Sequence, residues 1–313
     1  MNNAIKNILI PLDFTRKNEK FLNIAAAMAN RHGAKVHVLN VVPYSLLGTG
    51  SASSGKFFFH GNAMIESAEK QLATCKMVMS QITNEDVIAQ HAIGSVATEV
   101  LKYSNQKNID LILMPVQYPK RRPGFISSNT YEIITNSAVP VITIPENFNK
   151  EKFEKILFPI RNVKAVEDKL QSVIPIAKKN KANVRLVAID AFERNSNIRK
   201  LEDKVQLLGE KLSNSKIAAI KEDLRVSLEP HSDILALGEQ NNSDLIAVNV
   251  STEKSFTQLF KNNFTENIVY KSKRPVFFFR NEEDATPAQE YVCLLYTSPS
   301  PRDVEESRMP SSA

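Results

Sequence analysis

The histidines, cysteines and carboxylates of the sequence form no recognisable catalytic or metal-binding motif. The five histidines lack metal-ligand spacing, and there is no Gly-x-Ser-x-Gly elbow or paired carboxylate motif. His37 and His91 fall within strand-like runs, where we expect structural roles. We therefore expect a protein that is not an enzyme and has no metal site. The alternative is an active site assembled from residues that are distant in the sequence.

One segment comes close to a phosphate-binding P-loop. Gly50 to Phe57 reads GSASSGKF, which fits Gly-x4-Gly-Lys but has Phe57 where a Walker A motif needs Ser or Thr to bind Mg²⁺. Residues 43–49 also separate this segment from the strand-like run that it should follow directly. We expect a flexible loop instead, with the phenylalanines at 57–59 packed over the domain or against a partner.

Two other polar features could contact a ligand. Asp13 follows the first strand-like run, and open α/β sheets bind ligands at the carboxyl ends of their strands. Its simpler role is to cap the following helix or to order the turn. Lys120, Arg121 and Arg122 could hold an anion through their charge. The alternative for these three residues is a solvated basic loop.

Size and composition are those of a globular protein with two ordinary domains. The 313 residues are 42% hydrophobic and 24% charged, which is enough for a core in each domain. No stretch approaches the roughly 18 apolar residues of a membrane span, and the start lacks a secretory signal. The net charge of +6 is spread among acidic residues, and the two cysteines give no disulfide framework. We expect a cytoplasmic protein without a membrane or nucleic-acid partner.

The last residues resemble translated sequencing adapter. Cys293 to Asp303, CLLYTSPSPRD, can be back-translated into a transposase mosaic-end adapter, and Glu306 to Ala313, ESRMPSSA, resembles the adapter's flow-cell end. Residues 281–289 are polar and acidic. We therefore expect 282–313 to be a disordered tail that is artefactual from residue 293, and we exclude it from the fold.

The strongest internal signal is a repeat. NILIPLD at 7–13 is matched by KILFPIR at 155–161, and VHVLNVV at 36–42 by VRLVAID at 184–190, so both pairs lie 148 residues apart (155 − 7, 184 − 36). The later runs DLILM and PVITI match DLIAV and PVFFF at shorter offsets of 134 (244 − 110) and 135 (275 − 140). The second copy is therefore shorter, and it lacks a Gly/Ser/Phe-rich insertion at 43–62.

Both halves are predicted to have the same α/β architecture. Short apolar runs alternate with segments of helical period, which predicts two tandem, doubly wound, five-stranded parallel-sheet domains. We place these domains at residues 1–148 and 152–281. Thr15 is the expected N-cap of the first helix and Gly33 its end. The strands of the first half are expected near residues 6–12, 36–42, 87–91, 110–114 and 139–144.

These runs resemble the universal stress protein family. NILIPLDFT, AKVHVLNVV, DLILM and AVPVITIP carry the resemblance through the first half, and FPIR, VRLVAID, DLIAV and RPVFFF continue it more loosely. It implies a tandem two-domain member with a Rossmann-like fold. In the family's dimers the last strands face each other, so residues 139–144 and 275–279 would pair in an intramolecular pseudo-dimer and protect their sheet edges. Further homo-oligomers stay open.

The resemblance also implies where an adenine nucleotide would bind. Nucleotide-binding members have Gly-x2-Gly-x9-Gly-Ser/Thr after the fourth strand, because backbone N–H groups must approach the phosphates closely. Here PVQYPKRRPGFI at 115–126 precedes Ser127-Ser128, and proline offers no N–H. The second half has Asn262-Asn263 at the equivalent place, and Arg161 replaces the first-strand aspartate. The glycine phosphate loop is thus lost in both halves.

What remains is a degenerate candidate nucleotide site in the first half. In binding members of the family, the aspartate and the second-strand valine lie against the adenosine. The candidate residues of this chain are Pro11, Asp13, Val41, Met114, Pro115, Ser127 and Ser128.

The expected function is a non-catalytic stress-response module that acts through an unknown protein partner and has no cofactor. The alternative is a protein that binds ATP or AMP, or a slow ATPase, which uses the first half alone. A weaker third interpretation is a regulatory domain fused to a transporter or kinase.

Overall fold

The structure, a computed structural model, describes residues 4–14, 18–44, 56–116, 127–161, 166–190, 198–250 and 264–280, with the side chains of 56–62 and 223 left out. Several predicted features lie outside these residues. They are the tail with its adapter-like end, the loop with Lys120, Arg121 and Arg122, and the Asn262-Asn263 dipeptide. The expectations for these segments stay predictions.

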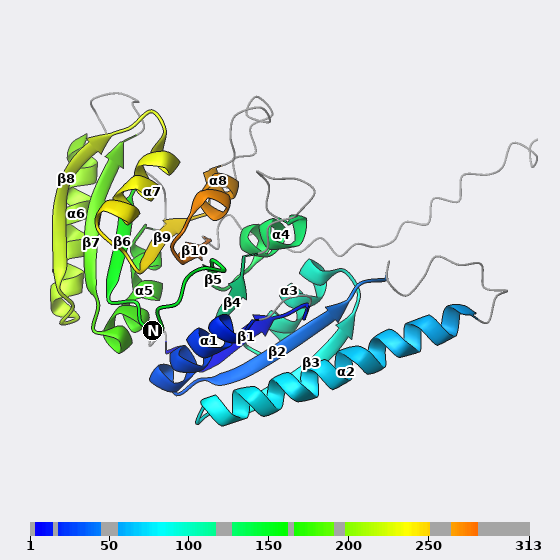
Figure 1. The fold of residues 1–313 in the computed structure, drawn as a ribbon. Coiled ribbons are helices and arrows are strands. Elements are labelled where there is room, and N and C mark those ends of the chain that lie inside the picture. Colours follow the sequence, from blue (N-terminus) through cyan, green and yellow to red (C-terminus); the bar gives the residue numbers. More distant parts are fainter. Residues whose placement is uncertain are drawn as a thin grey trace, which may run out of the picture.

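Ten strands form one sheet in the order β3-β2-β1-β4-β5-β10-β9-β6-β7-β8 (Figure 1). All neighbouring strands are parallel except β5 and β10, which are antiparallel and join the two halves edge to edge. The α/β class with a mostly parallel sheet is confirmed. The strands are β1 (Asn7–Pro11), β2 (Lys35–Val42), β3 (Val87–Ile93), β4 (Leu111–Pro115), β5 (Val141–Ile144), β6 (Lys155–Ile160), β7 (Asn183–Asp190), β8 (Ala219–Val226), β9 (Leu245–Asn249) and β10 (Val276–Phe279).

Helices cover both faces of the sheet, and each face has its own apolar core. One core takes residues from α1, α2, α5 and α6, and the other from α3, α4, α7 and α8. In β1, Ile8 and Ile10 belong to the first core and Leu9 to the second, as alternation along a doubly covered strand requires. The helices are α1 (Glu19–His32), α2 (Lys56–Ile82), α3 (Val96–Gln106), α4 (Ser128–Asn136), α5 (Val166–Asn180), α6 (Ile198–Asn214), α7 (Pro230–Gln240) and α8 (Phe264–Lys271).

The predicted start of the first helix is wrong, whereas its predicted end is confirmed. The helix begins at Glu19 with Asn18 as N-cap, so Thr15, outside the described residues, is not the cap. Phe14 has a positive φ of 55°, a backbone conformation that the chain must leave before a right-handed helix can begin. Gly33 ends the helix with φ 65°, a conformation that costs glycine little.

The second helix begins inside the predicted insertion. Because α2 starts at Lys56, the phenylalanines at 57–59 lie in a helix, and the expectation of a loop is wrong for them. Helix propagation from the amphipathic stretch behind them is favourable, and a single glycine at 61 costs only about 1 kcal/mol. The remainder of the P-loop-like segment, residues 50–55, lies outside the described residues.

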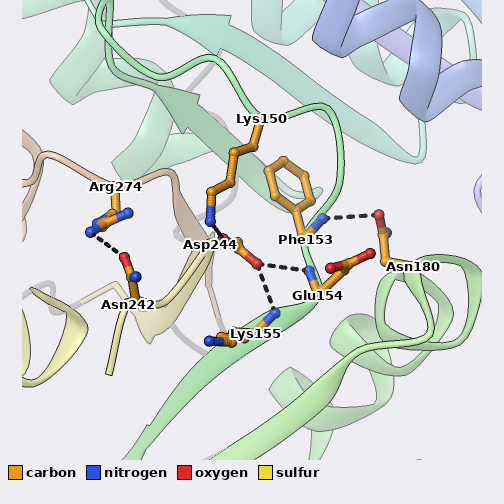
Figure 2. A network of polar contacts seen from close by, with 8 residues as sticks. All are labelled: Lys150, Phe153, Glu154, Lys155, Asn180, Asn242, Asp244 and Arg274. Atoms are coloured by element: carbon orange, nitrogen blue, oxygen red, sulfur yellow. Dashed lines mark hydrogen bonds and ion pairs between the residues drawn. The ribbon is translucent and has the colours of Figure 1, made fainter. Parts of the chain in front are cut away.

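In each half, an aspartate side chain binds the backbone at the start of the first strand. The Asp110 carboxylate accepts hydrogen bonds from the backbone N–H groups of Lys6 (2.8 Å) and Asn7 (2.9 Å). In the second half, Asp244 Oδ2 accepts from the N–H groups of the two residues at 154 and 155, at 3.0 Å each. Asp244 Oδ1 also binds Lys150 Nζ at 2.6 Å, as Figure 2 shows. Asp110, just before β4, thereby fixes the start of the neighbouring strand β1, and Asp244, just before β9, fixes the start of β6.

A buried polar chain links β1, β2 and α3. His37 Nδ1 lies 3.0 Å from the Tyr103 hydroxyl, and His37 Nε2 lies 3.4 Å from Asn7 Oδ1. Asn7 uses its amide N–H to bind the carbonyl of Asn108, so its oxygen faces the histidine as an acceptor. The proton of neutral His37 is thus assigned to Nε2, and Tyr103 donates to Nδ1. Burial, with smaller effects of Lys107 and Lys35, lowers the pKa of His37, consistent with this neutral, structural histidine.

Candidate functional site

A pocket of about 750 Å³ opens at the carboxyl ends of the central strands of the first half. β1 and β4 are paired only through Ile8 with Leu111 and Leu9 with Ile112, and the pocket is lined by residues from the ends of both strands. β1 is also the strand from which the chain order reverses, with β2 on one side and β4 on the other. Open α/β sheets bind ligands at such a switch point.

Six of the seven candidate residues line this pocket. They come from three strand ends and from the start of α4. Ser128, the first residue of α4, is not among the described lining residues. The residues brought together are Pro11, Asp13, Val41, Met114, Pro115 and Ser127.

Ser127 uses its hydroxyl to cap its own helix. Its Oγ accepts a hydrogen bond from the Thr130 N–H at 3.1 Å and lies 2.8 Å from the Thr130 hydroxyl. Helix α4 therefore begins at Ser128, with Ser127 as its N-cap. The cap satisfies one of the free N–H groups, and the positive end of the helix dipole points toward the pocket mouth.

Two parts of the pocket wall have no counterpart in the sequence prediction. Asn40 is buried in β2, and its amide donates to the Leu12 carbonyl at 2.7 Å, which holds the turn that carries Asp13. A buried asparagine within an apolar strand was a signal that could have indicated this role. The second part is the side of α2 with Met64, Ser67 and Gln71. That wall depends on helix placement, which local sequence does not encode.

The described lining of the pocket is mostly apolar and carries little charge. Most of its side chains are aliphatic, and Asp13 is the single ionisable side chain among the described lining residues. The prolines at 11, 43 and 115 offer no backbone N–H to a phosphate. A pocket of this kind buries a ring and orients it with a few polar groups, here Asp13, Asn40 and Gln71.

A second groove of about 510 Å³ adjoins the pocket. It lies between the start of α1 and the middle of α2, and it shares Leu12, Ser67 and Gln71 with the first pocket. Cys75 lies at its wall, and burial raises the pKa of this thiol to about 11. A protonated, buried thiol behaves as a small apolar group, so Cys75 is part of the apolar lining of this groove.

The corresponding place in the second half is built differently. Arg161 stands at the end of β6, where the repeat puts Asp13, and its guanidinium lies 4.3 Å from the centre of the Phe264 ring. Lys169 in α5 is buried and donates to the Pro159 carbonyl at 2.8 Å. Burial, with a smaller effect of Arg161, lowers the pKa of Lys169 well below its usual value. At this matched position, the carboxyl-end edge of the sheet therefore carries a carboxylate in the first half and a guanidinium in the second.

Neither a metal site nor a membrane span is found in the part of the chain that the structure describes. No three histidine, cysteine or acidic side chains gather there as metal ligands. Likewise, none of the helices in that part has both the length and the hydropathy to cross a bilayer.

Comparisons with known proteins agree with the fold. The sequence profile of the Universal stress protein family matches residues 4–145. A universal stress protein from Archaeoglobus fulgidus has a similar structure, with 18% identity and a TM-score of 0.71 over 90% of this chain and 98% of that chain. A Pseudomonas aeruginosa protein of unknown function follows, with 11% identity and a TM-score of 0.59 over 90% and 95%. No curated protein matches the sequence.

At these identities the two structures support the fold alone, whereas the profile addresses the sequence itself. The profile covers the strands of the first half, from β1 to β5, and ends beside the last of them. Residues 4–145 therefore belong to the universal stress protein family.

Proposed function

We propose that this protein is a stress-response module that binds an adenine nucleoside or nucleotide in its first half. One observation carries the proposal: six candidate residues from four distant segments line a single pocket at the sheet's switch point. The aliphatic wall suits a purine ring, and Asp13 is positioned at the strand end to accept hydrogen bonds from ribose hydroxyls. The missing glycines predict that the phosphates contribute little to affinity.

The module acts through a protein partner rather than through catalysis, and it works in the cytoplasm. This part of the proposal rests on the sequence, in which we recognise no catalytic motif. The two halves function as an intramolecular pseudo-dimer. The antiparallel pairing of β5 with β10, through Thr143 and Val276, Ile142 and Phe277, and Val141 and Phe278, supports this arrangement.

The test is calorimetric titration of ATP, AMP and adenosine into the full chain. We expect saturable micromolar binding, with affinities that differ by less than about tenfold among the three ligands. Asp13→Ala should weaken each of them by tenfold or more, which corresponds to about 1.4 kcal/mol. Arg161→Ala, the matched change in the second half, should leave binding unchanged. Absence of heat up to millimolar ligand would refute nucleotide binding.

A second candidate is an interaction module that binds no nucleotide. The loss of the glycine phosphate loop from the sequence favours it, because that loop supplies the phosphate contacts of binding members. It predicts that Asp13→Ala changes neither calorimetric heat nor partner binding.

A further inference from the structure

A lysine is buried in the second half beside the strands that correspond to the pocket-bearing strands of the first. Lys169 is 1% exposed, and its Nζ lies 2.8 Å from the Pro159 oxygen and 3.3 Å from the Ala247 oxygen. Nζ also lies 4.1 Å from the centre of the Phe158 ring. A buried amine is tolerated only with such partners, and it donates hydrogen bonds whether or not it is protonated. Lys169 thus links β6, which contains Pro159, to β9, which contains Ala247.

The place where β6 and β9 separate corresponds, in the repeat, to the place where β1 and β4 separate beside the pocket. β6 and β9 are paired only through Ile156 with Leu245 and Leu157 with Ile246, although both strands continue further. β1 and β4 are likewise paired at only two positions before they reach the pocket. In parallel strands that separate, the facing carbonyls need other partners. In the second half, Lys169 supplies these partners from the chain itself.

The repeat shows that this lysine is a replacement at a matched position. An offset of 148 residues aligns Pro159 with Pro11 and Lys169 with Phe21 (169 − 148). Phe21 is a buried aromatic side chain in the core of the first half. The same offset aligns Arg161 with Asp13 (161 − 148). The second half therefore differs in both a core residue and an edge residue at its switch point.

We propose that Lys169 acts as an internal ligand that closes the switch point of the second half, so that the chain holds one nucleoside, in the first half. The proposal rests on the proposed function and adds its stoichiometry and the residue that sets it. The amine ties β6 to β9, whose counterparts β1 and β4 contribute residues to the pocket, and it occupies one carbonyl acceptor on each strand. Arg161 adds a cation where the first half offers a carboxylate to the ribose.

The experiment counts adenosine and ATP sites by calorimetry in the full chain and in paired variants. Lys169→Phe with Arg161→Asp gives the second half the residues of the first. Lys169→Met with Arg161→Asp removes the amine at nearly constant side-chain length, in case the aromatic variant does not fold. Lys178→Met, at an exposed lysine of the same helix, is the matched control. Far-ultraviolet circular dichroism and thermal unfolding check the fold of each variant.

We expect one site per chain in the wild type and in Lys178→Met, and two sites in the paired variants. Adding Asp13→Ala should remove the first site from a paired variant and leave the new one. Two sites in the wild type would overturn the inference and leave the proposed function standing. One site in folded paired variants would also overturn it, since the amine would then not be what closes the second half.

If the wild type binds neither adenosine nor ATP, the proposed function and the role of Lys169 can still be judged separately. The proposed function would then fail for the first half. If the paired variants still gain one site, the role of Lys169 is supported independently. If they gain none, the inference fails as well.

Discussion

Removing the Asp244 carboxylate should destabilise the second half more than any comparable change in the first. Asp244 is buried, and it accepts hydrogen bonds from two backbone N–H groups and from Lys150 (Figure 2). Each N–H left without a partner costs about 1 kcal/mol or more. The lysine is half exposed, so its ion pair contributes at most about 1 kcal/mol. We expect Asp244→Ala to lower the free energy of unfolding by about 3 kcal/mol.

Two variants make this prediction sharper. Asp244→Asn keeps an oxygen for the two N–H groups and loses only the ion pair, so its cost should be about 1 kcal/mol. Asp110→Ala removes two N–H contacts at a more exposed carboxylate, for which no lysine partner is described. Its cost should be about 1 to 2 kcal/mol.

Urea unfolding followed by far-ultraviolet circular dichroism measures these differences, with an unchanged m-value showing that the unfolded state is not altered. A loss below about 0.5 kcal/mol for Asp244→Ala would refute the reasoning, because such a value is typical of an ordinary surface site. So would a larger loss for Asp110→Ala than for Asp244→Ala, since the lysine contact and deeper burial belong to Asp244.

Two further predictions concern histidines: His32, which is partly buried, and His37, which is buried. Burial, then Lys179 and Arg31, lower the pKa of His32 to about 4, so the unfolded chain binds a proton at higher pH than the folded chain. The contribution of His32 to the free energy of unfolding should be fully present above about pH 6.5 and fall by about 2 kcal/mol as the pH drops toward 4. Urea unfolding midpoints measured across this pH range check it. If the midpoints of His32→Gln fall with pH as steeply as those of the wild type, the prediction is wrong. Tyr103→Phe should cost about 1 to 2 kcal/mol in urea unfolding, because it leaves His37 Nδ1 buried without its donor; a neutral effect would mean that the hydroxyl is not the donor.

The central strands of the first half could be predicted from the sequence because parallel strands buried on both faces are short, continuous apolar runs. The site could be predicted in part, since five of the six residues lie at or just after the carboxyl ends of strands, and such ends of parallel strands meet at one edge of the sheet. The start of α1 could not, because Thr15 and Asn18 are both residue types that cap helices and the local sequence does not choose between them. Lys169 was missed because a lysine on a helix is normally solvated, although the repeat aligns it with the buried Phe21.

The antiparallel contact between β5 and β10 has a consequence for assembly. Both strands belong to one chain, so each edge meets its partner at the effective concentration of a tethered segment, which for short connections is on the order of millimolar. Dilution therefore does not separate the two halves, as it would separate two chains that meet through such edges. The free energy of this junction becomes part of unimolecular folding, and unfolding midpoints should be independent of protein concentration.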